Sequence, residues 1–413
     1  MFVTVLCILL VGGPPRLRVR DPAASLRGDI DAVVLFQLAV WALAGLWVAY
    51  HLFWSHRLGH RRIQVPLAQK LGLLLVGLLA IGTFVSHAPA FTAFKVYQIA
   101  VMLLWTLLFV RRYGVGACLW TLLWAYAVYC AAGAVAALYA PGAMFQATSV
   151  DVSRLNGDLI VLGFGQMATC GMILLLSMPT KLSRPVYFLV FALFACMIVL
   201  SVTRSAYLCL FAFAILAVLR RPTSTSARRA AHGLILSALL VISTGLLPGI
   251  SPWVLRESET IDTLDGRIGL WQYLSHITLS KSPVLGLGYY AASREYGSEY
   301  EEWSGTAHSA FVEVLVGGGL ASLSVMIALW VVLALSAASL LFRTNDSLIF
   351  AVCSLLIAVL LASNVGEGIE AGPIGFTFWC LAAIVPALRV SSPRAKVHPY
   401  GSDSSLALGI GAH

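Results

Sequence analysis

Long apolar runs recur along almost the whole chain, separated by short charged or Pro/Gly-containing breaks. A helix that crosses a bilayer needs about 20 mostly apolar residues and satisfies its own backbone hydrogen bonds where there is no water. The 413 residues are 60% hydrophobic and 11% charged, whereas soluble domains average about 25% charged residues. The runs therefore exclude an ordinary soluble enzyme and predict an all-α polytopic membrane protein.

The runs predict about 12 transmembrane helices. Their approximate bounds are 2–13, 33–53, 67–86, 96–110, 115–140, 159–178, 186–203, 205–219, 232–250, 309–341, 347–364 and 373–388. The first run has 12 residues, and a full crossing needs at least about 17. Because Pro14 and Pro15 end this run, we expect it to be re-entrant, interfacial or a tilted helix in a thinned region.

The basic residues between the runs indicate the orientation of the chain, since cytoplasmic loops carry an excess of Lys and Arg. One set of alternate loops and the tail hold 16 of them: Arg57, Arg61, Arg62, Lys70, Arg111, Arg112, Lys181, Arg184, Arg220, Arg221, Arg228, Arg229, Arg343, Arg389, Arg394 and Lys396. The opposing short loops hold Lys95, Arg154 and Arg204. This asymmetry places the second set outside, although the Arg-rich stretch 16–27 would also lie outside if the first run crosses.

The segment between the ninth and tenth runs is long enough to hold a site. Residues 251–308 contain 8 of the 18 acidic residues and carry a net charge of −4, while the rest of the chain carries +13. The orientation places this segment outside. We therefore expect helices 1–9 in residues 1–250, an external segment with interfacial helices in 251–308, helices 10–12 in 309–390 and a cytoplasmic tail in 391–413.

Neither the cysteines nor the common nucleotide motifs indicate a cofactor. All eight cysteines lie in apolar runs without a C-x-x-C pair, so they are interpreted as small buried hydrophobes. No zinc-protease, Walker or dinucleotide motif occurs in a suitable context. We expect no metal, nucleotide or other cofactor. Nucleic acid is not expected as a partner either, because the excess Arg lies in short loops between apolar runs.

The external segment contains one clear helix pattern. Asp265 can cap a helix that begins at Gly266, and the sequence Ser282-Pro283 ends it. Its apolar residues recur every three positions and predict one apolar face: Ile268, Trp271, Leu274 and Ile277. Such a helix suits the membrane interface, and a helix that packs over the bundle fits the periodicity equally well.

Three side chains could act on a substrate at this external face. Arg204 lies between two apolar runs, where a charge is costly unless it snorkels, pairs or faces a polar cavity. His308 lies where the external segment meets the tenth run, and a His with a reference pKa of about 6.5 can accept a proton at neutral pH. With Arg267, these residues form a receptor suited to phosphate and to a pyrophosphate leaving group. Singly, Arg204 also fits a helix-end marker and His308 a capping residue. Glu313 could orient a polar neighbour or lie in a water-exposed first turn.

Four motifs carry a family resemblance. They are Val-Thr-Arg-Ser-Ala-Tyr (202–207), Asp-Gly-Arg-Ile-Gly-Leu-Trp (265–271), Lys-Ser-Pro-Val-Leu-Gly-Leu-Gly (281–288) and Ala-His-Ser-Ala-Phe-Val-Glu-Val-Leu-Val-Gly-Gly-Gly-Leu (307–320). In order and spacing they resemble the O-antigen ligase and polymerase superfamily of bacterial polytopic glycosyltransferases. Ser309 departs from the family pattern, which usually has Asn there, so the hydrogen-bonding support of the His and the acceptor preference are expected to differ.

The resemblance implies a GT-C-like glycosyltransferase at the periplasmic face of the bacterial inner membrane. It would move a glycan from undecaprenyl pyrophosphate to an acceptor hydroxyl of lipid A-core, with inversion and without a metal. Arg204 and Arg267 would hold the pyrophosphate, and His308 would be the general base or would position the acceptor hydroxyl. Membrane lipid would surround a polyprenyl groove roofed by helix 266–280. Further substrate-binding candidates are Ser309, Glu313, Arg154 and Asp158, and weaker ones are Lys95, Glu367 and Glu370.

Other activities also fit the sequence. The same superfamily contains polymerases and protein O-oligosaccharyltransferases, and the ligase is favoured because a single external segment carries all the loop motifs. A polysaccharide transporter or flippase would also suit twelve spans, but transporters place charged and helix-breaking residues near the bilayer midplane. Here the runs are nearly free of charge. The glycines at 163, 165, 171 and 317–319 could break helices or allow close helix packing.

Overall fold

The computed structural model describes residues 6–7, 9–11, 31–57, 65–147, 153–155, 163–179, 182–201, 203–220, 267–300, 305–343, 346–364, 369 and 372–391. Its membrane-type helices are α3 (Ala32–Arg57), α4 (Leu67–Ile81), α5 (Pro89–Tyr139), α7 (Phe164–Ser177), α8 (Arg184–Ser201), α9 (Arg204–Arg220), α14 (Ala310–Arg343), α15 (Ser347–Asn364) and α16 (Pro373–Ser391). A 3-10 turn, η1 (Gly82–Val85), extends α4. Two helices, α12 (Arg267–Lys281) and α13 (Ala291–Tyr300), belong to the segment predicted to lie outside.

Within these ranges, six helices are long and apolar enough to cross a membrane: α3, α4 with η1, α5, α8, α14 and α15. The helices α7, α9 and α16 are shorter and also apolar. A multi-pass helical membrane protein is therefore confirmed. The number of twelve spans stays a prediction, because the run 232–250 and most of the run 2–13 lie outside the described residues.

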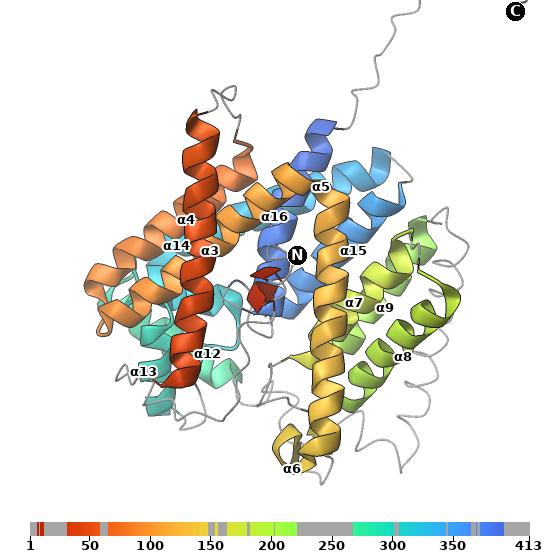
Figure 1. Ribbon diagram of the computed structural model, residues 1–413. Coiled ribbons are helices and arrows are strands. Elements are labelled where there is room, and N and C mark those ends of the chain that lie inside the picture. The colour runs from red at the N-terminus through yellow and green to blue at the C-terminus, as the bar shows by residue number, and fades with distance from the viewer. Residues whose placement is uncertain are drawn as a thin grey trace, which may run out of the picture.

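Helix α5 joins two of the predicted spans. It covers 51 residues and contains one residue with non-helical angles, Gly114 at φ 83° and ψ 168°. A positive φ of this size is readily available to glycine alone, so the chain changes direction there. Figure 1 shows the two halves of α5 running in different directions. The charged break at Arg111 and Arg112, which separated two runs in the sequence, therefore lies beside a bend within one helical stretch.

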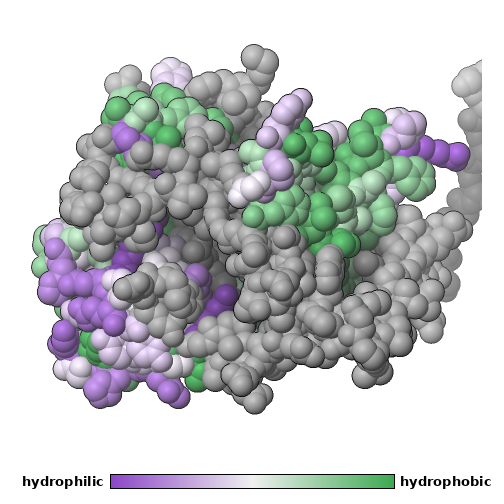
Figure 2. All heavy atoms as spheres, turned by 90° about the horizontal axis from the view of Figure 1, so that it is seen from below, coloured by the Kyte–Doolittle hydropathy of each residue, from purple (hydrophilic) through white to green (hydrophobic). Residues whose placement is uncertain are grey.

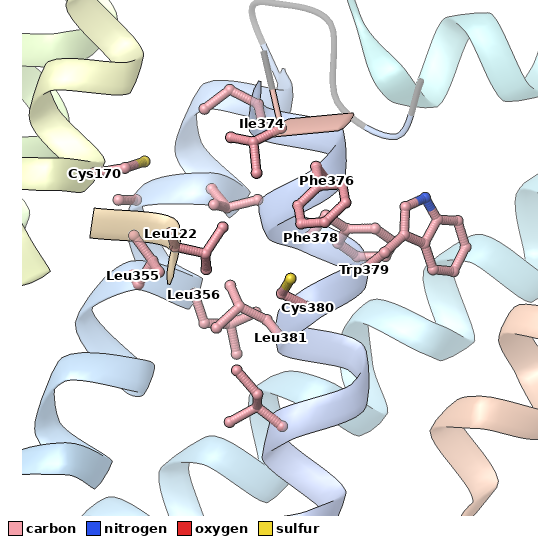
Figure 3. Packing of buried hydrophobic residues seen from close by; sticks show 14 of the residues in the cluster. Leu122, Cys170, Leu355, Leu356, Ile374, Phe376, Phe378, Trp379, Cys380 and Leu381 are labelled. Atoms are coloured by element: carbon pink, nitrogen blue, oxygen red, sulfur yellow. The ribbon is translucent and has the colours of Figure 1, made fainter. Parts of the chain in front are cut away.

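The core lies where α16, α5, α15 and α7 pack together. Figure 3 shows Phe376, Phe378 and Trp379 of α16 packed in a cluster that includes Leu122 of α5 and Leu355 of α15. Large apolar side chains also cover the outside, including Phe84, Leu138 and Phe342, which are 90%, 81% and 79% exposed. A water-soluble protein rarely exposes contiguous apolar surface on this scale, so these side chains are placed to face lipid.

A small element departs from the all-α expectation. After the one-turn helix α6 (Pro141–Met144), strands β1 (Phe145–Ala147) and β2 (Ser153–Leu155) pair antiparallel, with Phe145 opposite Leu155. The sequence prediction carried the fifth run to residue 140 and began the sixth at 159, and left these residues as a loop. Since each strand has three residues, the fold remains helical.

Some of the glycines singled out in the sequence interrupt or precede helices, and others allow two helices to pack closely. Gly319 has φ 65° and interrupts α14, and Gly163 adopts a left-handed conformation immediately before α7. Gly165 and Gly171 allow close packing instead, because a Cβ atom there would collide with Ser201 and Phe194 of α8, respectively. Close approach of α7 and α8 therefore depends on these two small residues.

Candidate active site

His308 lies immediately before α14 in a constrained backbone conformation. It is half-buried and has φ 50°, which is uncommon for a residue other than glycine. The preceding residue, Ala307, is held on both sides. Its N–H donates to Oε2 of Glu313 over 3.2 Å, and its carbonyl accepts from Nε1 of Trp271 over 2.7 Å. These two bonds fix the peptide groups that orient His308.

Glu313 is the residue that joins three segments at this point. It is 3% exposed, and its Oε1 accepts from the N–H of Tyr290 over 3.1 Å and from Oγ of Ser293 over 2.7 Å. A buried carboxylate is costly unless donors surround it. The same carboxylate therefore ties the start of α13 and the loop before α14 to the first turn of α14. The water-exposed first turn was the wrong alternative, and the alternative of orienting polar neighbours fits these bonds.

Arg267 is the first described residue of the external segment and begins α12. It is half-buried and lies four residues before Trp271, so both belong to one face of the helix. Because Trp271 is bonded to Ala307, the N-terminal half of α12 is joined to the residue that precedes His308. Gly269 supports this docking, since a Cβ atom there would collide with the Tyr300 hydroxyl of α13.

The apolar face of α12 differs from the predicted one. Leu274 is buried as expected, but its buried companions are Leu270 and Thr278, while Ile268, Trp271 and Ile277 are half-buried. The helix packs against α13 and α14, and spacings of four residues point at these neighbours. The predicted end at Ser282-Pro283 is confirmed, because α12 ends at Lys281. The predicted cap Asp265 lies outside the described residues.

A second set of backbone bonds anchors the site to the broken helix α14. The N–H groups of Leu287 and Gly288 donate to the carbonyls of Val316 and Gly317 over 2.8 and 3.2 Å. On the other side of the break, the N–H of Leu320 donates to the carbonyl of Pro283 over 2.8 Å. A break in a membrane helix leaves backbone groups that must find partners in protein. The backbone of segment 283–288 supplies these partners. The motif 281–288 thus has a structural role that could not be predicted from its sequence.

Cations rest on aromatic rings on the α13 side of the site. Lys95 of α5 lies 4.4 Å from the ring centre of Tyr290, and Arg294 of α13 lies 5.3 Å from that of Phe91. Lys281 at the end of α12 donates from Nζ to the Tyr296 hydroxyl over 3.1 Å, and this bond raises the pKa of Lys281 above its ordinary value. The contacts of Lys95 with the Tyr290 ring and of Arg294 with the Phe91 ring are of cation–π type. Among these residues, the sequence pattern singled out Lys95 alone, as a weak candidate.

Polar surface gathers on the side of the molecule where α12 and α13 lie. These helices expose Gln272, His276, Ser280, Lys281 and Glu299. Figure 2 shows hydrophilic residues concentrated on that side of the viewed face, with hydrophobic residues elsewhere. An apolar bundle with one polar end fits a site at a membrane surface rather than at the midplane.

The remaining predicted site residues are described only in part. Arg204 begins α9 and Arg154 lies in β2, but their side chains are not among the described parts of the structure. Four other residues lie entirely outside the described ranges: Asp158, Asp265, Glu367 and Glu370. Ser309 is 5% exposed and its carbonyl accepts from the N–H of Glu313 over 2.9 Å, so it lies immediately before α14 and accepts a hydrogen bond from its first turn. Its predicted contact with substrate stays a prediction.

Most of the cysteines lie inside the helical bundle. Seven cysteines are buried, as the apolar runs predicted, whereas Cys196 of α8 is exposed. Across the described ranges, no group of three or more His, Cys, Asp or Glu residues is arranged to hold a metal ion.

The fold defines a multi-pass helical membrane protein, and the candidate site with Arg267 and His308 lies at the polar end of its bundle. A family model described as O-antigen ligase matches residues 189–327 of the chain. All four motifs lie within that range, which runs from α8 into α14, so this part of the chain is similar to the O-antigen ligase family, and the match supports the resemblance that the motifs indicated. A search of curated proteins found no match to the chain.

Proposed function

We propose that this protein is an O-antigen ligase-like glycosyltransferase of the bacterial inner membrane. It transfers a glycan from undecaprenyl pyrophosphate to an acceptor hydroxyl of lipid A-core at the periplasmic face, and it requires no metal. The hydrogen bond from Trp271 to the Ala307 carbonyl carries this proposal, because it joins α12, the helix that begins at Arg267, to the residue that precedes His308. A permanent cation and an imidazole at one protein surface are the groups that pyrophosphate departure and hydroxyl attack require.

The reaction is a single displacement at the anomeric carbon. The imidazole of His308 takes the proton of the acceptor hydroxyl, whose oxygen forms the new bond to the sugar carbon. The bond from that carbon to the pyrophosphate oxygen breaks, and the electron pair leaves with the lipid pyrophosphate. Arg267 and Arg204 stabilise the charge that accumulates there, and they act more strongly in the transition state than in the ground state. Attack opposite the leaving group inverts the sugar configuration, and retention by product NMR would contradict this mechanism.

The backbone around His308 supports a base of fixed position. Reacting groups must be held close to their productive geometry, since small displacements cost large factors in rate. The bonds of Glu313 and Trp271 to the two sides of Ala307 provide this restraint. The polyprenyl chain would lie against the apolar helices below α12, with α12 as the roof.

The test is a glycan-transfer assay in membranes that lack any homologous enzyme, with lipid-pyrophosphate glycan as donor and lipid A-core as acceptor. Loss of a general base lowers rates about 10²–10⁴-fold, and loss of a charge-stabilising donor about 10²–10³-fold. We therefore expect His308→Ala and Arg267→Ala to lose transfer at matched expression. His276→Ala, an exposed His of α12, and Arg343→Ala, at the far end of α14, are matched controls that should transfer normally.

Other outcomes of the same assay identify the competing activities. Lengthening of the lipid-linked glycan by the wild-type protein would indicate a polymerase, and transfer to a protein acceptor would indicate an O-oligosaccharyltransferase. Normal transfer by His308→Ala and Arg267→Ala would contradict the proposed site. If the protein moves lipid-linked glycan across the bilayer of reconstituted vesicles and forms no new glycosidic bond, it is a transporter.

A further inference from the structure

The loop that follows α12 exposes apolar side chains, although it belongs to the segment predicted to lie outside. Val284 and Leu285 are 58% and 36% exposed, and Leu279, in the last turn of α12, is 46% exposed. The neighbouring helix α13 instead exposes polar residues such as Ser298 and Glu299. Leu279, Val284 and Leu285 therefore form an apolar tip on an otherwise polar segment.

The apolar tip adjoins the exposed end of α4. A Cβ atom on Gly82, which begins η1, would lie 3.6 Å from the Leu285 carbonyl oxygen and 2.7 Å from that of Gly317. Close to Gly82, Phe84 and Val85 are 90% and 45% exposed. The tip and η1 thus form one apolar surface, of a kind that marks contact with a membrane or with another protein.

Helix α14 shows where this surface lies relative to the hydrocarbon of a bilayer. The large apolar side chains that α14 exposes extend from Leu320 to Phe342, and Arg343 follows immediately. At about 1.5 Å per residue these two positions are about 33 Å apart, which matches a hydrocarbon core of about 30 Å. The N–H of Leu320 donates to the Pro283 carbonyl over 2.8 Å. The loop therefore meets α14 where the lipid-facing length of this helix begins.

Helix α4 gives the same position independently. Its apolar length with η1 runs from Leu67 to Val85, a candidate span of 19 residues. The α-helical part to Ile81 and the 3-10 turn together measure about 29 Å. Because Gly82 lies against the Leu285 carbonyl, the tip again lies at the end of a helix of membrane length.

The backbone and the nearest charge of the loop also suit this boundary. Backbone groups beside hydrocarbon must find partners in protein, since lipid offers none. The N–H of Gly286 donates to the Ser282 carbonyl over 3.0 Å, and other backbone groups of the loop bond to α14. Nζ of the exposed Lys281 donates to the Tyr296 hydroxyl of α13 over 3.1 Å. This bond holds the charge on the polar side of the tip.

We propose that the apolar tip and η1 insert into the bilayer, at the boundary between headgroups and acyl chains of the leaflet that adjoins α12 and α13. In the predicted orientation this is the outer leaflet. Acyl chains are the partner that the surface fits, because it terminates the lipid-facing lengths of α4 and α14. The loop connects α12 to α13, so its insertion holds both helices, and with them the candidate site, at the membrane surface.

Spin labelling of the full-length protein in phosphatidylcholine nanodiscs tests this placement. In a Cys196→Ala background, which removes the exposed cysteine, labels are attached through Val284→Cys and Phe84→Cys. Collisions with oxygen, which concentrates in hydrocarbon, are compared with collisions with a polar nickel chelate, which stays in water. At both sites we expect an oxygen-to-nickel ratio several-fold higher than at Ser298→Cys on α13. The ratio should be lower than at Ile327→Cys, an exposed position about 10 Å deeper along α14.

Three results would overturn the proposal. A ratio at Val284→Cys as low as that at Ser298→Cys would place the loop in water, and a ratio as high as that at Ile327→Cys would place it deep in the bilayer. Low collision rates with both reagents would show that protein covers the surface. Phe84→Cys makes the same prediction through α4, so it decides the question if Val284→Cys does not fold. Thermal unfolding of each labelled variant is compared with that of Cys196→Ala to establish folding.

Discussion

At the scale of single residues, Glu313 is a buried carboxylate whose hydrogen bonds join the segments around His308. Its carboxylate accepts from two backbone N–H groups and one hydroxyl, at 2.7 to 3.2 Å. The charge is therefore compensated by three donors, each of which belongs to a segment that shapes the site. Removal of such an acceptor leaves its buried donors without a partner, which costs more than the bonds themselves.

We expect Glu313→Ala to destabilise the protein by about 3–5 kcal/mol and to abolish transfer, because three buried donors lose their acceptor. Glu313→Gln keeps the shape and one acceptor oxygen and should lose about 1–3 kcal/mol. Thermal unfolding in detergent with a transfer assay measures both. Glu299→Gln is the control, since Glu299 is exposed and accepts from the Tyr273 hydroxyl. Wild-type stability in Glu313→Ala would contradict this role.

Trp271→Phe should raise the activation free energy of transfer by more than it lowers the free energy of unfolding. The substitution keeps a ring but removes the N–H that holds the Ala307 carbonyl, a bond worth about 0.5–1.5 kcal/mol. His308 would lose one of its two backbone restraints. Trp330→Phe is a matched control, because Trp330 is buried and its Nε1 donates no hydrogen bond within the described part of the chain. A larger loss of transfer in Trp330→Phe than in Trp271→Phe would refute the assignment.

At the scale of elements, the break in α14 connects the membrane bundle to the site. The two helical halves of α14 meet at Gly319, and the segment 283–288 bonds to backbone groups on both sides of it. A shift of this segment would move α12 on one side and α13 on the other, since it links them. The position of the candidate site relative to the bundle therefore depends on a glycine eleven residues beyond His308.

Gly319→Ala is expected to destabilise the protein strongly and to abolish transfer. Its backbone has φ 65°, and a Cβ atom would collide with the backbone of Val284. Either effect alone costs about 1–3 kcal/mol. Gly77→Ala in α4 is the control, because a Cβ atom there meets nothing within 4 Å and alanine favours the helix by about 1 kcal/mol. Expression, thermal unfolding and transfer are measured for both, and equal behaviour of the two variants would show that the break is dispensable.

At the scale of the whole molecule, charge and apolar surface together determine how the protein lies in a membrane. Exposed apolar side chains cover the helices, and the polar helices α12 and α13 lie at one end. The Lys and Arg count, 16 against 3 in the opposing loops, predicts that this end faces outside.

Cysteine accessibility in intact cells tests this orientation. Ser298→Cys places a thiol on an exposed position of α13, and Asp346→Cys places one on an exposed position before α15, at the predicted inner surface. A membrane-impermeant maleimide should label the first and not the second, and permeabilised cells should label both. The unmodified protein, whose exposed Cys196 lies in the apolar helix α8, sets the background. Labelling of Asp346→Cys alone in intact cells would reverse the topology.

Much of the helical layout could be predicted, because long apolar segments satisfy their own backbone bonds wherever they lie in a bilayer. The bounds of α15 match the expected run 347–364, and α12 ends where Ser282-Pro283 indicated. The buried face of α12 was predicted less well. Its side chains pack against two neighbours, α13 and α14, whose positions the local periodicity does not contain.

The sequence by itself determined that this chain is a multi-pass helical membrane protein, and its motifs indicated His308 and Arg267 as site residues. Local composition and order carry this information, since hydropathy and charge act on each segment separately. Only the tertiary structure decided that Trp271 and Glu313 hold the backbone before His308, that segment 283–288 completes the broken helix α14, and that Lys95 meets Arg294 around Phe91. These contacts join residues far apart in the chain, and they exist only once the helices are packed.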